Sequence, residues 1–470
     1  MKGSRVRFDL IASRPVRAIV KSRLFPVILQ AGMLVLVGLL ALNGLGLGSG
    51  MSSEELMTFR KTNLTTLVVW GLWWPGMIAV ALVFGRAWCT VCPLELVNRA
   101  GDAIARQVGW PRARLGKVLR AGWMIVVVYL VMQILVAGVS LHRLPHYTAI
   151  LLLVLLGGAL LTGLIFQQPR SFCRAFCPAG ALLSVYGRYT PFQLEARDPS
   201  VCASCPTKDC IRGKNRYRFD KRSCPSLLRP FHRDPSDGCV LCLQCAKVCP
   251  YDNMGVGLVT REAPVRQKAL LEPHEAAFVM VALGFVAHEV IGEVEWLDAV
   301  FHFVPGQLAT LVSGVPFGWF EGLWFLMLFP LAVWAAIAGV GRLAGHRAGL
   351  RSLLLAAATG AAPIVAIAHL GKAVAKISSW GGYLPLSLRD PQGLETLRHL
   401  ADRSFSAPTA MVGLTALGWV MLALVLVIAW RAWRWARQIP SESILATRAG
   451  LIGALLLFTS ALAAWSWPGL

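Results

Sequence analysis

The chain has 470 residues, is 56% hydrophobic, and carries a formal net charge of +22 at pH 7 with a mean hydropathy of +0.60. This composition excludes an ordinary soluble domain, because apolar stretches near the ~20 residues that span a bilayer recur along the chain. The positive charge requires no nucleic acid as partner, since basic loops on one side of a membrane account for it. We expect a mainly α, polytopic protein embedded in the lipid bilayer.

Nine apolar stretches are predicted to form transmembrane helices, approximately at 25–46, 64–84, 123–141, 148–166, 276–294, 319–340, 353–370, 411–430 and 449–467. Residues 1–24 form a basic segment, expected to be an interfacial helix on anionic lipid or a plain topology signal. A four-helix membrane core with two Cys-Pro motifs is expected at 25–190, and a C-terminal membrane domain of about five helices at 271–470.

The distribution of basic residues predicts the orientation in the membrane. When the loops are assigned alternately to the two sides, one side holds 38 of the 46 Lys and Arg residues. The positive-inside rule then places the N-terminus and residues 191–260 in the cytoplasm and the C-terminus in the periplasm. We therefore expect a multi-pass protein of the bacterial inner (plasma) membrane.

An internal repeat follows the second and fourth stretches, where cysteine pairs precede Pro93 and Pro178. The pairs are Cys89 with Cys92 and Cys173 with Cys177. Two similar hairpins could bring these four thiols together, which would suit a third iron-sulfur cluster or a soft metal such as zinc or copper(I). The alternatives are dithiol pairs that act in redox chemistry or pass on a metal, and unliganded pairs whose prolines only turn the chain.

Eight further cysteines lie in a segment at 191–260. Cys239, Cys242, Cys245 and Cys249-Pro250 have the C-x2-C-x2-C-x3-C-P spacing of a bacterial ferredoxin, and Cys202, Cys205, Cys210 and Cys224 form an upstream set. Crossed ligation would give one [4Fe-4S] cluster held by Cys202, Cys205, Cys210 and Cys249, and another held by Cys239, Cys242, Cys245 and Cys224. Structural zinc and disulfides are weaker alternatives. The segment is expected to be a small ferredoxin-like α+β domain inserted between helices 4 and 5.

Polar residues within the C-terminal stretches are the other candidates. His288 and His369 could be axial ligands of a b-type haem, and the acidic residues around His288 could instead bind a metal or relay protons from a quinol. Histidines at helix ends with a purely structural role are the alternative. Basic residues between Cys210 and Cys224 could steer an acidic donor such as ferredoxin or flavodoxin, or simply follow the positive-inside bias.

Residues 25–256 resemble the NapH and NosR type of membrane-bound polyferredoxin. The resemblance rests on four spans, CxxxCP-like motifs after the second and fourth, and a two-cluster ferredoxin segment, although Cys89 and Cys92 are separated by two residues rather than three. It implies electron transfer between the quinone pool or a cytoplasmic donor and a membrane or periplasmic redox protein, as in a quinol dehydrogenase or a relay subunit. Copper-reducing assembly ferredoxins share the cysteine-rich core, so reduction or handover of copper during maturation of a respiratory enzyme is the alternative function. No catalytic residue is assigned.

Overall fold

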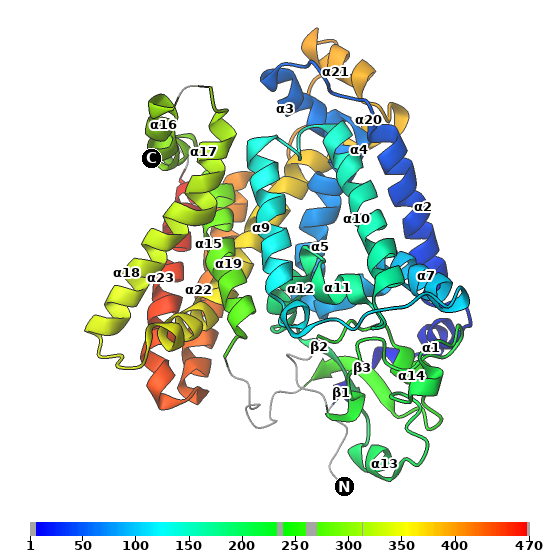
Figure 1. Cartoon of the computed structure of the whole chain (residues 1–470). Coiled ribbons are helices and arrows are strands. Elements are labelled where there is room, and N and C mark those ends of the chain that lie inside the picture. Colours follow the sequence, from blue (N-terminus) through cyan, green and yellow to red (C-terminus); the bar gives the residue numbers. More distant parts are fainter. Residues whose placement is uncertain (1–5, 233–237, 260–269, 313, 468–470) are drawn as a thin grey trace. The chain divides into compact units, whose positions relative to one another are not determined.

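Helices dominate the computed structural model, which describes residues 6–232, 238–259, 270–312 and 314–467 (Figure 1). The chain divides into two compact units. Unit 1 comprises residues 1–38, 80–121 and 154–268, and unit 2 comprises residues 39–79, 122–153 and 269–470. These units are defined by compactness alone. The domain boundaries predicted from the sequence, at residues 24, 190, 260 and 271, stay predictions.

Eight helical segments of the described chain are long and apolar enough to cross a membrane. They are Val27–Gly44, Leu64–Gln107, Pro145–Ile165, Pro273–Ile291, Phe317–Leu343, Leu350–Gly381, Leu414–Gln438 and Ser441–Ser466. The remaining predicted stretch forms α9 (Trp123–Gly138), an apolar helix of 16 residues that is about 24 Å long. The structure thus supports a multi-pass membrane protein with eight full-length candidate spans rather than nine.

Two of these spans contain a wider π-helical stretch immediately before a proline. The stretch η2 (Leu67–Trp73) precedes Pro75 of α5 (Trp74–Phe84), and η6 (Trp324–Leu328) precedes Pro330 of α18 (Phe329–Leu343). Proline lacks an N–H and its ring crowds the carbonyl four residues earlier, so the preceding turn widens. Both helices therefore continue through their prolines instead of ending there.

Unit 1 is built around a small antiparallel sheet with the strand order β1-β3-β2. The strands are β1 (Val6–Arg7), β2 (Phe192–Ala196) and β3 (Met254–Val259), and Leu194 of β2 lies opposite Val256 of β3. Leu194, Val256 and Met254 form the buried core together with Ile11 and Cys245. The short helices of this unit are η1 (Leu10–Ala12), α1 (Arg14–Lys21), η3 (Gly85–Ala87), α6 (Trp88–Val91), α7 (Pro93–Gln107), α8 (Lys117–Arg120), α11 (Ser171–Ala175), α12 (Ala179–Gly187), α13 (Pro199–Ser204), η4 (Gly213–Asn215), η5 (Pro230–His232) and α14 (Gln244–Val248).

The basic N-terminal segment joins this sheet. Asp9 accepts hydrogen bonds from the backbone N–H groups of Ile11 and Val256 and forms an ion pair with Arg197. From α1, Arg17 and Lys21 both pair with Asp252, three residues after Cys249. The sequence predicts a lipid-facing helix or a topology signal here, and it did not predict these contacts with the cysteine-rich segment.

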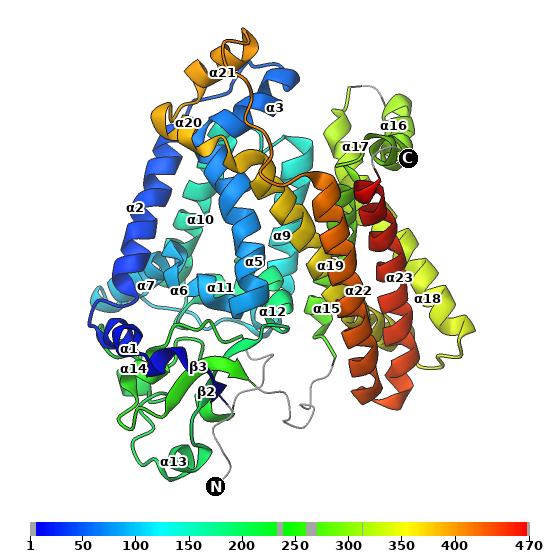
Figure 2. The same ribbon diagram turned by 180° about the vertical axis from the view of Figure 1, so that it is seen from behind.

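Unit 2 is a helical bundle in which α19 (Leu350–Gly381) and α23 (Ser441–Ser466) pack most closely (Figure 2). A Cβ atom added to Gly360 would lie 1.9 Å from the carbonyl oxygen of Thr447, and one added to Gly450 would lie 1.9 Å from that of Ala357. Only glycine allows this approach of the two backbones. The other helices of unit 2 are α3 (Ser53–Thr62), α4 (Leu64–Thr66), α15 (Pro273–Ile291), α16 (Glu295–Leu311), α17 (Phe317–Leu323), α20 (Leu384–Arg389), α21 (Leu394–Ala401), α22 (Leu414–Trp435) and η7 (Ala436–Gln438), while α2 (Val27–Gly44), α5 and α10 (Pro145–Ile165) contribute residues to both units.

Candidate functional site

All twelve cysteines are free thiols and lie in unit 1. Five of them line one pocket, and we refer to four of these as group A: Cys202, Cys205, Cys210 and Cys249. The first two belong to α13 and its C-terminal cap, where Asp198 caps the helix start. Cys249 follows α14, so it reaches group A from a separate part of the chain. Group A is the first set of four that crossed ligation predicts.

A second pocket, of about 350 Å³, is lined by Cys224, Cys239, Cys242 and Cys245, which we call group B. Cys245 lines both pockets, so the two groups are adjacent. Burial and the neighbouring Cys224 raise the pKa of Cys242 to about 12. Four thiols so close together and at least partly buried repel one another's negative charge when they ionise, whereas a metal ion that binds a thiol deprotonates it. The donor set of each group therefore fits a metal centre.

The backbone around the cysteines is held in an uncommon conformation. Nine non-glycine residues of the described chain have φ between +43° and +59°, and six of these lie within three residues of a cysteine: Arg170, Lys208, Leu227, Leu241, Leu243 and Asp252. Each of these left-handed backbone conformations costs about 1–2 kcal/mol for a residue with a side chain. Such strain persists only where the surroundings enforce it, and it concentrates at functional sites.

N–H groups point at the sulfur atoms in both groups. In group A, the Asn253 side chain donates to Cys202 Sγ at 3.3 Å, its backbone N–H donates to Cys249 Sγ at 3.4 Å, and the Lys208 N–H donates to Cys205 Sγ at 3.4 Å. In group B, Cys224 and Cys242 accept from backbone N–H groups that follow them in the chain. Hydrogen bonds of this kind to cysteine sulfurs stabilise thiolates and set the reduction potential of an iron-sulfur cluster.

The remaining four cysteines, the Cys-Pro group, are also brought together: Cys89, Cys92, Cys173 and Cys177 interact electrostatically with one another. Both repeats have the same local geometry, because Leu94 and Ala179, each two residues after its cysteine, donate a backbone N–H to Cys92 and Cys177. Burial and the neighbouring thiols raise the pKa of Cys177 to about 12. The pairs predicted to meet at the ends of two hairpins thus form one set of four thiols, of which Cys173 is buried and the others are partly buried.

Tight contact between α7 and α10 holds these hairpins together within unit 1. A Cβ atom added to Gly163 would lie 2.1 Å from the carbonyl oxygen of Asn98, and one added to Gly101 would lie 2.4 Å from that of Leu160. The Asn98 side chain also donates to the Ala159 carbonyl at 2.9 Å and to Ser171 Oγ at 3.0 Å. Ser171 begins α11, which carries Cys173, so this contact positions one half of the Cys-Pro group.

A buried arginine links the Cys-Pro group to group B. Arg170 is 6% exposed and interacts electrostatically with Cys173 and Cys89 on one side and with Cys242 on the other. Its Nη1 donates to Ser226 Oγ at 2.8 Å. The positive charge of Arg170 is thus placed to favour thiolates in both groups.

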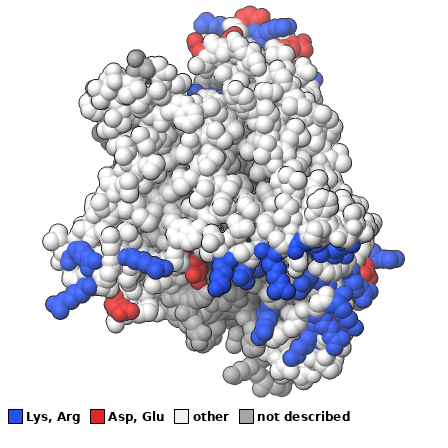
Figure 3. All heavy atoms as spheres, viewed as in Figure 1, with Lys and Arg blue, Asp and Glu red and all other residues white. Residues whose placement is uncertain are grey.

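The basic insert between Cys210 and Cys224 contributes to a further pocket of unit 1, of about 860 Å³. Six arginines line it, Arg99, Arg106, Arg170, Arg216, Arg218 and Arg222, together with Tyr217 and Phe219. Arg222 is neutralised there, because it forms a 2.8 Å ion pair with the buried Glu95, which also accepts from Gln30 at 2.8 Å. Lys and Arg side chains gather over α7 and the short helices near the sheet on the face drawn in Figure 3. This surface is strongly basic.

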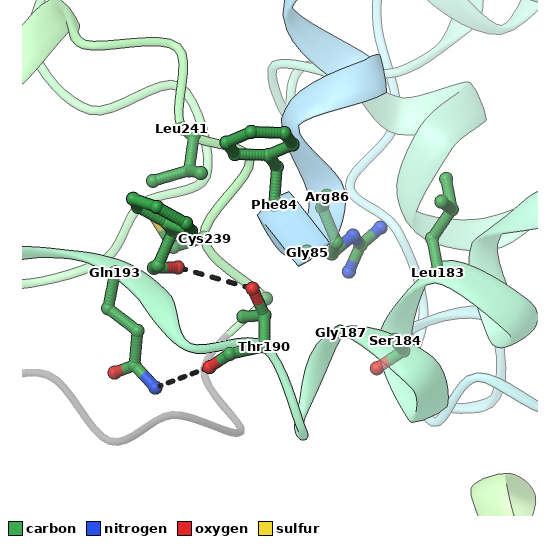
Figure 4. Close-up of a pocket in the computed structure, with 12 residues that line it drawn as sticks. Phe84, Gly85, Arg86, Leu183, Ser184, Gly187, Thr190, Gln193, Cys239 and Leu241 are labelled. Carbon is green, nitrogen blue, oxygen red and sulfur yellow. Dashed lines mark hydrogen bonds between the residues drawn. The ribbon is translucent and has the colours of Figure 1, made fainter. Parts of the chain in front are cut away.

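A narrow cleft of unit 1, with an internal space of about 30 Å³, opens beside group B (Figure 4). It lies where α5 ends, and its walls are apolar at Phe84 and Leu241 and polar at Arg86 and Thr190. Cys239 of group B is part of its lining. The cleft therefore gives solvent-sized access to a cysteine of group B.

The two histidines predicted as haem ligands belong to unit 2. His288 on α15 stacks on Phe325, with ring centroids 4.4 Å apart, and lies near Glu321 and His302. His369 is buried on α19 and meets the edge of Phe285 at 5.7 Å. The haem stays a prediction. Sequence reasoning missed Glu321, because a lone glutamate in an apolar stretch has no spacing signal.

Comparisons with known proteins give no family for this chain. No family model matches it, and no solved structure matches it. Two uncharacterized proteins of Methanocaldococcus jannaschii are similar to parts of it. One is 32% identical over 124 residues, covering 26% of this chain and 42% of that protein, and the other is 24% identical over 190 residues, covering 37% and 74%. The chain thus spans less than half of the first relative, and any function must be argued from the site.

Proposed function

We propose that this protein is a membrane-bound iron-sulfur protein that relays single electrons between a cytoplasmic or quinol donor and a membrane or periplasmic redox partner. One observation carries the proposal: Cys249 lies with the upstream cysteines in group A, while Cys224 lies with the downstream cysteines in group B. This exchange of the fourth cysteine is the ligand pattern of two-cluster bacterial ferredoxins. Separate zinc sites formed from each run would not need it. The resemblance to NapH and NosR type proteins agrees with it.

In this proposal, group A and group B each hold one [4Fe-4S] cluster, and the clusters supply one-electron redox chemistry. The protein contributes thiolates, N–H donors to sulfur from Asn253 and Lys208, and the positive charge of Arg170. These groups favour the thiolate ligands and tune the reduction potentials. Because group A adjoins group B, and Arg170 links group B to the Cys-Pro group, the three sites form a series along which electrons could pass.

The donor side of the proposal has one candidate docking place in unit 1. The arginine-lined pocket suits an acidic carrier such as ferredoxin or flavodoxin, whereas the cleft beside Cys239 would have to widen to admit the ring of a quinol. The basic loops support a cytoplasmic position for unit 1 in the inner membrane. A hydrocarbon core of roughly 30 Å is too thick for one electron hop, so transfer to the periplasm needs a quinone or a haem in addition.

The exchange of the fourth cysteine can be tested by iron and sulfide analysis of anaerobically purified protein, with EPR. If group A and group B each bind a cluster, Cys249→Ala loses about four irons per chain. The double variant Cys249→Ala/Cys202→Ala then loses no more, because both cysteines serve one cluster. Cys249→Ala/Cys245→Ala loses about eight. Zinc in place of iron and sulfide, or equal losses in the two double variants, would refute the proposal.

The Cys-Pro group supports a second candidate function, which is reduction or handover of copper during maturation of a respiratory enzyme. Four clustered thiols are soft ligands, and soft ligands select copper(I), zinc or an iron-sulfur cluster. Cys92→Ser and Cys177→Ser distinguish the functions. Loss of stoichiometric copper with the iron of groups A and B retained favours maturation, whereas loss of about four further irons favours a third cluster in an electron relay.

A further inference from the structure

Three metal-ligating side chains from three different helices meet in unit 2. They are His288 near the end of α15, His302 on α16 and Glu321 on α17, and one ligand atom from each lies within 4.8 Å of the others. Glu321 Oε1 is 3.1 Å from His302 Nε2 and 3.7 Å from His288 Nε2. This cluster shares no residue with the cysteine groups of unit 1.

The hydrogen-bond partner of His302 determines which of its nitrogens is free. His302 Nδ1 lies 3.0 Å from both the backbone oxygen and the Oδ1 atom of Asp298, so Nδ1 carries the proton that is donated there. The lone pair of Nε2 then faces the Glu321 carboxylate. Two acceptors 3.1 Å apart repel each other unless a positive charge lies between them or on the imidazole. A proton or a metal ion must therefore be present.

A proton accounts for only part of the cluster. If His302 were an imidazolium, its two N–H groups would satisfy Asp298 and Glu321, but His288 would remain to be explained. His288 Nε2 also points to Glu321, and its buried Nδ1 has no hydrogen-bond partner among the described residues. His288 Nε2 is 3.7 Å from Glu321 Oε1, which is too long for a hydrogen bond. A divalent cation among the three ligand atoms, which all lie within 4.8 Å of one another, would be bound by both histidines and the carboxylate at once.

We propose that His288, His302 and Glu321 form a binding site for a divalent first-row transition metal ion such as Zn²⁺. Two imidazoles and one carboxylate without a thiolate suit Zn²⁺ or Fe²⁺ and do not suit copper(I). Asp298 orients His302 in the way that carboxylates beside metal-bound histidines do. Phe325, stacked on His288, and Phe317, 6.0 Å from His302, give the site an apolar wall.

The ligand count indicates what kind of metal site this is. Structural zinc sites have four protein ligands, whereas sites with three protein ligands keep a position for water or substrate. The three side chains are between 18% and 21% exposed, so an ion and a small ligand can reach them. The site is thus of the open kind, able to hold a metal-bound water, and it is distinct from the proposed haem at His288 and His369, which would compete for His288.

Zinc binding to purified full-length protein tests this proposal. Protein treated with a mild chelator is reloaded with Zn²⁺, and bound zinc is measured by mass spectrometry and X-ray absorption at the zinc edge. We expect one zinc per chain with nitrogen and oxygen neighbours at roughly 2.0–2.1 Å, whereas zinc on the cysteines would show sulfur at roughly 2.3 Å. Glu321→Gln and His302→Ala should lose this zinc, and Asp298→Asn should weaken its affinity about 10- to 100-fold.

His399→Ala is the matched control, because His399 also lies four residues from a carboxylate, Glu395, at 3.8 Å, but outside the cluster. It should bind zinc like the wild type. Size-exclusion profiles check that Glu321→Gln, which keeps the side-chain shape, is folded. Equal zinc binding by wild type and folded Glu321→Gln, or a sulfur shell around the bound zinc, would overturn the proposal and leave the cluster as an ion pair. The difference in zinc binding between wild type and Glu321→Gln does not depend on whether unit 1 binds iron, because both proteins carry the same cysteines.

Discussion

The two units bring their candidate ligand residues together in different ways. In unit 1, eleven of the twelve cysteines come from short runs in which two to four residues separate neighbours, Cys224 stands alone, and the fold assembles all twelve into three groups. In unit 2, the polar residues that meet are single side chains from different helices. Lys372 of α19 pairs with Glu293 at 2.6 Å and with Glu289 at 3.5 Å, and Glu321 lies between His288 and His302.

This difference shows when the spacing of residues in the sequence can predict a binding site. A metal centre held by a loop needs its ligands at fixed short intervals, because the chain must wrap around one point. A site between packed helices needs only one residue on each, and the sequence interval between them is arbitrary. The candidate site of unit 1 can therefore be predicted from the sequence. The candidate site of unit 2 can be recognised only from the packing of the helices.

The largest expected effect of a substitution comes from the buried ion pair of unit 1. Glu95→Gln leaves Arg222, which is 4% exposed, without its partner, and breaking such a pair costs about 3–5 kcal/mol. The measurement is the free energy of unfolding in mild detergent, followed by circular dichroism. Asp220→Asn, which removes the more exposed 3.4 Å pair with Arg218, should cost less than about 1 kcal/mol. Equal losses would mean that the pair with Glu95 is not buried.

The same contrast governs what the sequence could predict. The length of the apolar stretches predicted a helical membrane protein. The spacing of the cysteines predicted which of them would lie together in groups A and B. The strands were not located, since Gly255 and Gly257 weaken the β signal of β3, and β1 has only two residues. The docking of Asp9 on β3 depends on a contact across 247 residues of chain, which no local pattern encodes.

Close helix contacts exist in both units, and a single added methyl group should distinguish a true contact from a loose one. Gly450→Ala places a Cβ atom 1.9 Å from the Ala357 carbonyl, so α23 must move away from α19, at a cost of about 1–3 kcal/mol. Gly163→Ala should destabilise unit 1 in the same way. Gly157→Ala, with no atom within 4 Å of the new Cβ, is the control and should be neutral or slightly stabilising. The unfolding midpoint in detergent is the measurement.

A smaller effect is expected where the N-terminal segment joins the sheet. Asp9→Asn keeps the side-chain shape but removes the charge that accepts from two backbone N–H groups and pairs with Arg197. Hydrogen bonds to charged groups are worth about 1.5–3 kcal/mol, and this site is partly exposed, so a loss near the lower value is expected. Hydrogen exchange of the β3 amides should accelerate while exchange in α19 stays unchanged. A uniform acceleration in both units would instead indicate global unfolding.

The last prediction concerns the proposed chemistry of unit 1, at a residue that also forms two hydrogen bonds with the backbone of Asp198. Asn253→Ala removes the N–H donor to Cys202 Sγ but keeps the backbone donor to Cys249. Because a hydrogen bond to a cluster sulfur favours the reduced, more negative state, its loss should lower the potential of the group A cluster and leave that of group B unchanged. Redox titration followed by EPR measures both potentials in one sample, so group B serves as the internal control. Equal shifts at both would mean that Asn253 acts on the fold of the segment and not on one sulfur.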